Sequence, residues 1–309
     1  MSETNPIMPT SNLPPCPIVT AYEKVDLAPH LDFVQNTERM EHALRLLKSV
    51  DLYEIMYRVR KGLVVKGYIA MPHNGEKLPC LIHLRGGSGD FGRLDARQLL
   101  WQVVAYAGDG YMVITTQYPG VEGGEGKDTF GGKDDIASIQ KLREILKYIP
   151  QADTNRIGVK GHSRGGLMAY MLLRESSWIR AAVIAGAPTD QVRMGKEREG
   201  WREHQIKMFG ASKNELLRRS PIKWVRELPK KTPLLILHGS SDKRVDAGQS
   251  MDMSRALLDA KVPHRFVLFE GADHGITEFR AEYHDMTRLW FRRYLVSDRI
   301  LPNLKLHGL

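Results

Sequence analysis

Hydrophobic positions along the chain follow two different periodicities. Short apolar runs of strand length alternate with longer segments in which apolar residues recur every three or four positions, as on one face of a helix. The strand-like runs are 52–60, 63–71, 79–84, 111–116, 156–160, 180–185, 233–237 and 265–269. The helix-like segments are 31–50, 94–107, 134–148, 278–295 and the stretch that follows Ser163. Strands that alternate with helices of this length predict an α/β fold with a mostly parallel central sheet and helices on both faces.

The two ends and one insertion depart from this alternation. Residues 1–30 are rich in proline and lack the basic and apolar regions of a secretory signal, so we predict an N-terminal arm, disordered or lying on the domain surface. Residues 31–309 are predicted to form a single domain. Within that domain, residues 190–231 are longer than an ordinary connection and are interpreted as a short helical cap or lid. The first two strands, joined by Lys61-Gly62, are predicted to form a hairpin at a sheet edge.

Composition narrows the classes of partner. The chain has 309 residues and a formal charge of +9, but its basic residues are scattered, so we expect no nucleic-acid partner. No apolar run has the roughly 20 residues that span a bilayer, so we expect no membrane partner. The two cysteines, Cys16 and Cys80, imply no disulfide framework and fit a reducing, cytoplasmic location. No His/Cys cluster has metal-ligand spacing, and we expect neither a metal nor a cofactor.

A Gly-x-Ser-x-Gly pentapeptide lies where a strand-like run meets a helix-like segment. Ser163 is at its centre, between Gly161 and Gly165. A nucleophile elbow needs this context, because a sharp turn exposes the serine hydroxyl at the strand end while the glycines let strand and helix approach closely. The pattern predicts Ser163 as a nucleophile and His162 as a packing residue that points away from the reaction. The alternative is a glycine-rich turn with an incidental serine.

Two further polar residues follow later predicted strands. Asp242 comes after the run 233–237, and His274 comes after the run 265–269. Active sites of open α/β sheets gather at the carboxyl ends of the strands, and Ser…Asp…His is the chain order of an α/β-hydrolase triad. The hydroxyl needs a base, and the imidazole needs a carboxylate to hold its tautomer. Asp246 is the alternative acid. The alternative bases are His204, His238 and His264.

A glycine-rich loop after the run 79–84 is the predicted oxyanion site. In this fold one backbone N–H comes from that loop and the other from the residue after the nucleophile. We therefore nominate the amides of Gly87 and Arg164, with Gly86 as the second choice. The same loop matches a dinucleotide fingerprint, but the next strand does not end in the acidic residue that would bind a ribose.

Together these motifs resemble the catalytic domain of the prolyl oligopeptidase family of serine hydrolases, within the α/β-hydrolase superfamily. The resemblance runs roughly over residues 57–295. It rests on the pentapeptide, on Tyr118-Pro119-Gly120 with Gly131 and Asp135, on Ser220-Pro221, on the run 233–239 with Asp242 and Val245, and on Asp273-His274-Gly275. It implies that Ser163, Asp242 and His274 occupy the nucleophile, acid and base positions of the family. One departure is Arg85, which stands where relatives often have histidine and is expected to change the charge at the oxyanion rim.

The resemblance implies a serine peptidase that forms an acyl-enzyme on a small-molecule or short peptide substrate. Peptidases of the family carry a β-propeller before the hydrolase domain, and residues 1–56 are too few for one, so a carboxylesterase is the first alternative. A non-catalytic binding module on the same fold is the alternative from another class. Specificity is expected to come from the pocket and the segment 190–231. Its basic residues could contact an acidic substrate or form a solvated helix face; they are Arg193, Lys196, Arg198 and Arg202.

Overall fold

The computed structural model describes residues 13–297, 300–305 and 307. These residues form one nine-stranded sheet in the order β1-β2-β3-β5-β4-β6-β7-β8-β9. Its strands are β1 (Val19–Lys24), β2 (Val50–Arg60), β3 (Leu63–Pro72), β4 (Leu78–Leu84), β5 (Met112–Thr116), β6 (Ala152–His162), β7 (Ile179–Ala185), β8 (Leu234–Gly239) and β9 (His264–Phe269). In the order of the sheet, the first three pairs (β1–β2, β2–β3 and β3–β5) are antiparallel. All the pairs that follow, from β5–β4 to β8–β9, are parallel. The mostly parallel sheet predicted from the sequence is confirmed.

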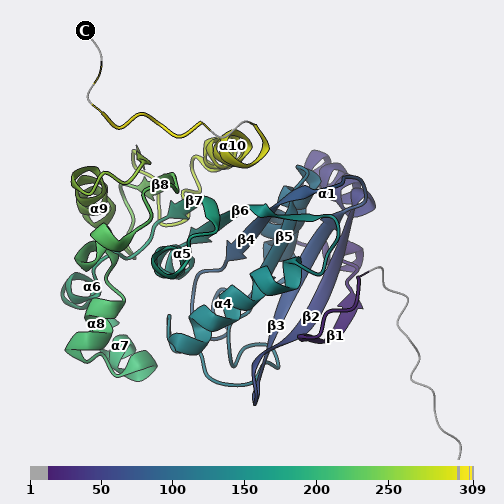
Figure 1. Ribbon diagram of the computed structural model, residues 1–309, viewed down its shortest axis with the longest axis horizontal. Coiled ribbons are helices and arrows are strands. Elements are labelled where there is room, and N and C mark those ends of the chain that lie inside the picture. Colours follow the sequence, from purple (N-terminus) through teal and green to yellow (C-terminus); the bar gives the residue numbers. More distant parts are fainter. Residues whose placement is uncertain (1–12, 298–299, 306, 308–309) are drawn as a thin grey trace, which may run out of the picture.

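Helices cover both faces of the sheet, as the alternating pattern predicts (Figure 1). One layer contains α4 (Lys133–Leu146), α5 (Arg164–Glu175) and α9 (Gly248–Asp259). The other contains α1 (Thr37–Ser49), the continuous helical stretch of α2 (Ala96–Gln98), η2 (Leu99–Val104) and α3 (Ala105–Gly108), and α10 (Arg280–Phe291) extended by η5 (Arg292–Val296). The segments η2 and η5 are π-helical, so two helices predicted as regular contain wider turns.

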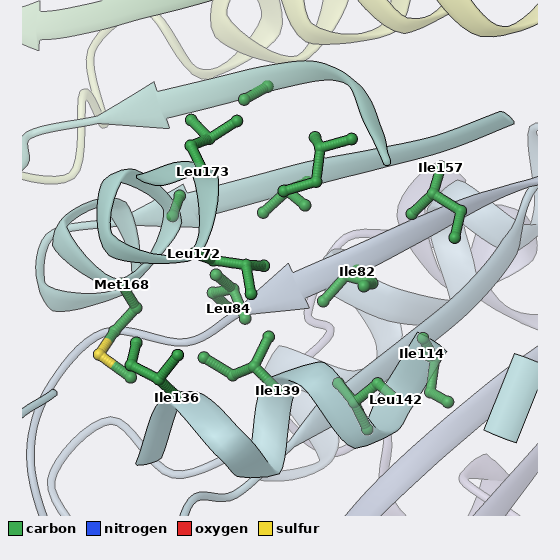
Figure 2. Close-up of a cluster of buried hydrophobic side chains, with 14 of the residues drawn as sticks. Ile82, Leu84, Ile114, Ile136, Ile139, Leu142, Ile157, Met168, Leu172 and Leu173 are labelled. Atoms are coloured by element: carbon green, nitrogen blue, oxygen red, sulfur yellow. The ribbon is translucent and has the colours of Figure 1, made fainter. Parts of the chain in front are cut away.

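The central strands are buried on both faces, which explains their nearly continuous apolar runs. Every residue of β4, β5 and β8 is buried. Figure 2 shows one side of this core, where side chains of α4 and α5 meet those of β4, β5 and β6. The labelled side chains are Ile82, Leu84, Ile114, Ile136, Ile139, Leu142, Ile157, Met168, Leu172 and Leu173. Burial of this size is the main favourable term in folding, and it fixes the strand ends at which the site lies.

The N-terminal region differs from the prediction. Residues 19–24 form β1, which pairs with β2, so part of the segment interpreted as an arm is the edge strand of the sheet. The hairpin of β2 and β3 is therefore not at the edge. In β1 only Val19 and Tyr22 are partly buried and the other four residues are exposed, so this edge strand lacks the apolar pattern that marks a strand in the sequence. Residues 1–12 of the predicted arm lie outside the described residues.

The segment 190–231 is helical. It contains α6 (Gln191–Glu197), α7 (Trp201–Phe209), α8 (Lys213–Arg218) and the short turns η3 (Pro221–Lys223) and η4 (Val225–Glu227). These helices gather beside α9, away from α1 and α10 (Figure 1). Across the ranges that the structure describes, no helix is both long and apolar enough to span a bilayer.

Candidate active site

Ser163 occupies the sharp turn between β6 and α5. Its backbone has φ 57° and ψ −124°, a region that side-chain-bearing residues rarely adopt. The Ser163 N–H donates to the carbonyl of Ala185 on the neighbouring strand at 2.7 Å, and its own carbonyl accepts the first N–H groups of α5. The surrounding structure therefore holds the strained turn that a nucleophile elbow requires.

The two glycines of the pentapeptide are sterically required. A Cβ on Gly161 would lie 2.2 Å from the carbonyl oxygen of Gly165, and a Cβ on Gly165 would lie 1.9 Å from that of Leu84. Both distances are far below van der Waals contact. Strand β6, helix α5 and strand β4 can thus approach around Ser163 only where side chains are absent.

His274 and Asp242 form a short hydrogen bond. The Nδ1 of His274 lies 2.6 Å from Oδ2 of Asp242, whose side chain is fully buried. The other carboxylate oxygen accepts the N–H groups of Arg244 and Val245 at 2.7 and 3.0 Å. Burial alone would raise the pKa of Asp242, but the hydrogen bonds from His238 and His274 outweigh it and lower the pKa below its ordinary range. Asp242 is therefore an anion that fixes one tautomer of His274.

His238 is a second partner of Asp242. Its Nε2 lies 3.1 Å from Oδ2 of Asp242 and 2.9 Å from the carbonyl of Val245, while its Nδ1 lies 2.7 Å from the hydroxyl of Ser250. Two oxygen acceptors at Nε2 place the proton there, so Nδ1 accepts from Ser250. From the sequence, His238 is only an alternative base, whereas in the structure it lies at the end of β8 as a buried support for the carboxylate of Asp242.

His162 packs against His274 and does not point away from the site. Its Nε2 lies 2.7 Å from the carbonyl oxygen of His274, and the two imidazole rings are 4.7 Å apart. A Cβ on Gly186 would lie 3.4 Å from both rings, so this glycine leaves room for the pair. Burial, with a smaller contribution from His274, lowers the pKa of His162 to about 4. His162 is therefore neutral at physiological pH and donates its N–H to hold the loop that bears His274.

The glycine-rich loop lies directly against Ser163. A Cβ on Gly86 would lie 3.5 Å from Cβ of Ser163, and Gly87 has a φ of 70°. Arg85 anchors the loop, because its buried guanidinium donates to the backbone carbonyls of Gln117, Gly86, Gly89 and Phe91. Arg85 is only 1% exposed and its hydrogen bonds lie within the loop, while its effect on the charge at the oxyanion rim stays a prediction.

The side chain of Arg164 connects the elbow to the same loop. It donates to the carbonyl of Gly87 at 3.1 Å and to Asp128 at 2.5 Å, and Asp135 lies 3.6 Å away. Asp128 in turn accepts the N–H of Gly89 at 2.8 Å. Burial would lower the pKa of Arg164, but the two carboxylates outweigh it and raise the pKa. This buried cluster ties the residue after Ser163 to the predicted oxyanion loop.

A cavity of about 670 Å³ opens over these residues. Ser163, His274, Gly86 and Gly87 all line it. Its other walls come from α1, the α2–η2 stretch and α10, and in the described chain none of its lining residues belongs to 190–231. No group of three or more potential metal ligands occurs among the described residues. The segment predicted as a lid thus contributes no wall to this cavity, and its role as a lid stays a prediction.

Comparison with known proteins identifies the family. The model of the prolyl oligopeptidase family matches residues 98–297, which span the elbow, Asp242 and His274. The chain belongs to the prolyl oligopeptidase family. Membership confirms the resemblance seen in the motifs.

The family's curated and solved members support the same fold and chemistry. The uncharacterized peptidase YtmA of Bacillus subtilis is 27% identical over 221 residues, covering 70% of this chain and 83% of its own. The acylamino-acid-releasing enzyme of Rattus norvegicus is 27% identical over 207 residues, covering 61% of this chain and 28% of its own. The acylaminoacyl peptidase of Pyrococcus horikoshii superposes with a TM-score of 0.73 at 21% identity, over 85% of this chain and 45% of its own, and shows the α/β-hydrolase fold. The chain spans less than half of these last two relatives. Peptidase relatives favour the peptidase interpretation over the esterase and the non-catalytic module.

Proposed function

We propose that the chain is a serine peptidase that works through an acyl-enzyme, with Ser163 as nucleophile, His274 as base and Asp242 as the orienting acid. The observation that carries this proposal is the cavity that Ser163 and His274 share, with Ser163 on a strained turn and His274 bonded through Nδ1 to a buried carboxylate. A tautomer fixed at Nδ1–H leaves Nε2 free to take a proton.

The proposed reaction has two balanced halves. Ser163 Oγ attacks the scissile carbonyl while His274 takes its proton, and the resulting oxyanion accepts the backbone N–H groups of Gly87 and Arg164, with Gly86 as the second choice for the loop donor. The amine then leaves with the proton from His274. Water, deprotonated by His274, attacks the acyl-enzyme, and release of the acid regenerates the Ser163 hydroxyl.

Active-site labelling tests this proposal. We expect a fluorophosphonate probe to modify Ser163 in the wild type and to leave Ser163→Ala unmodified. Hydrolysis of N-acyl-peptide anilides should fall by at least about 10⁴-fold in Ser163→Ala and in His274→Gln. Ser254→Ala on α9 is the matched control, since this serine bonds to His264 and does not line the cavity. Unreduced labelling or turnover in Ser163→Ala would reject the assignment. Comparison of the anilides with p-nitrophenyl acetate separates peptidase from esterase preference.

A further inference from the structure

The cavity over Ser163 extends toward three arginines that come from different elements. Arg39 lies on α1, Arg97 on α2 and Arg280 at the start of α10. All three also line an adjoining pocket of about 290 Å³, together with Phe33 and Trp101. The three guanidinium groups therefore stand at the junction between the cavity that contains Ser163 and a second, smaller compartment.

These arginines have no acidic partner. Throughout the described ranges, none of the three makes an ion pair, and the one carboxylate that lines the main cavity, Asp285, lies 3.8 Å from Arg288. Arg97 packs over the ring of Phe33 at 5.2 Å, which positions its charge without neutralising it. Arg193 in the segment 190–231, by contrast, bonds to three carboxylates.

The other cationic groups of the cavity are already engaged. Arg85 donates to backbone carbonyls, Arg244 lies over the ring of Phe91 at 5.1 Å, and Arg288 bonds to Asp109 at 2.7 Å. Within the described chain, the junction arginines are thus lining cations without a carboxylate partner; Arg244 also contacts only a ring through its guanidinium, but it lies in the loop that holds Asp242. Three like charges beside partly apolar walls produce a positive potential that concentrates anions.

A second feature of the cavity indicates a polar ligand. His83 lines it, is only 4% exposed, and neither of its ring nitrogens has a hydrogen-bond partner. Its register neighbour Lys160 bonds instead to Gln102 at 3.0 Å. A buried imidazole without a partner is uncommon in proteins, because the lost hydration is normally replaced. A bound polar substrate would supply that partner.

We propose that the substrate of this enzyme is a peptide or acyl-peptide that carries a carboxylate, and that Arg39, Arg97 and Arg280 bind this group where the cavity meets the smaller pocket. Guanidinium groups suit the site because their planar N–H pairs match the two oxygens of a carboxylate. The inference rests on the proposed peptidase function and adds the class of substrate. The carboxylate is either the free C-terminus of the peptide or an acidic group on the acyl side.

Binding to the inactive variant Ser163→Ala separates these sources. Three ligands of one tripeptide sequence are compared by calorimetry: N-acetyl with a free C-terminus, N-acetyl with a C-terminal amide, and N-succinyl with a C-terminal amide. We expect one of the two anionic ligands to bind at least about tenfold more tightly than the neutral ligand, a difference of about 1.4 kcal/mol. Equal binding of all three ligands would overturn the proposal.

Charge-removing variants test the arginines themselves. In Arg39→Gln/Arg97→Gln/Arg280→Gln the preference for the anionic ligand should fall to within about twofold, with binding of the neutral ligand unchanged. Arg45→Gln is the matched control, because Arg45 lies on the same helix α1 and outside the cavity. An equal loss of affinity for the neutral and anionic ligands in the triple variant would contradict carboxylate recognition. The same loss of preference for the anionic ligand in Arg45→Gln would contradict it too. Fluorophosphonate labelling of the wild type is scored separately, so a failure of the proposed catalytic function is distinguished from a failure of this inference.

Discussion

Replacing Asp128 by asparagine tests how the residue after Ser163 is tied to the oxyanion loop. Asp128 is 7% exposed and accepts from Arg164 and from the N–H groups of Gly89 and Phe130. Removing one charge of a buried pair costs about 3–5 kcal/mol, because the remaining charge stays buried without compensation. In the variant Arg164 would still have Asp135 at 3.6 Å. We therefore expect the free energy of unfolding to fall by about 3 kcal/mol, at the lower end of that range.

The matched control is Asp134→Asn, six positions further along the chain. Asp134 pairs with Arg60 at 2.7 Å, but the two side chains are 37% and 56% exposed. Exposed pairs contribute about 0–1 kcal/mol, so this variant should change the free energy of unfolding by less than about 1 kcal/mol. Urea denaturation followed by circular dichroism measures both values, and fluorophosphonate labelling should slow only in Asp128→Asn. Two variants that differ by less than about 0.5 kcal/mol would refute the reasoning.

Three further predictions follow from the site. Gly165→Ala should destabilise the protein by about 3 kcal/mol or more, measured by denaturation, because its Cβ would lie 1.9 Å from a backbone carbonyl oxygen of β4. His238→Gln should lower kcat/KM about tenfold while the protein stays folded, because Asp242 loses one of its two imidazole partners. Unchanged kcat/KM would contradict a positioning role. Burial lowers the pKa of His162 to about 4 and that of His284 to about 3, whereas both titrate near 6.5 when unfolded, so the unfolded state binds more protons and stability should fall as the pH decreases below about 6.5. Thermal midpoints measured from pH 7 to pH 4 should fall less steeply in His284→Asn than in the wild type.

The arrangement of strands was predictable because the central strands are buried on both faces. Their apolar runs are nearly continuous, and the glycines around Ser163 mark the close approach of β6, α5 and β4. Strand β1 was missed because it pairs with one neighbour only and four of its six residues are exposed, which leaves no apolar pattern in the sequence. Helix α9 was also missed, since eight of its twelve residues are polar or small and its apolar stripe is narrow.

The catalytic candidates were predictable because each follows a strand, and all parallel strands end at one edge of the sheet. Supporting residues were harder to assign. His238 is adjacent to the turn that contains Asp242, yet nothing in the sequence distinguishes a histidine that supports a carboxylate from one that acts as a base. Arg85 was noted only as a departure from the histidine of relatives, and the sequence did not indicate that its guanidinium donates to backbone carbonyls of the loop.

Residues that line the cavity over Ser163 could not be found from periodicity. Arg39, Arg97 and Arg280 lie on the polar stripes of their helices, and a helical pattern reveals only which face is buried. Whether a polar face meets solvent or a cavity depends on contacts between segments far apart in the chain. From the sequence, specificity was expected from the pocket and the long segment 190–231; within that segment Arg193 forms surface ion pairs. Walls of the cavity come from α1, α2 and α10. Grafting these three elements from a relative should therefore change the substrate preference more than grafting the helical segment 190–231.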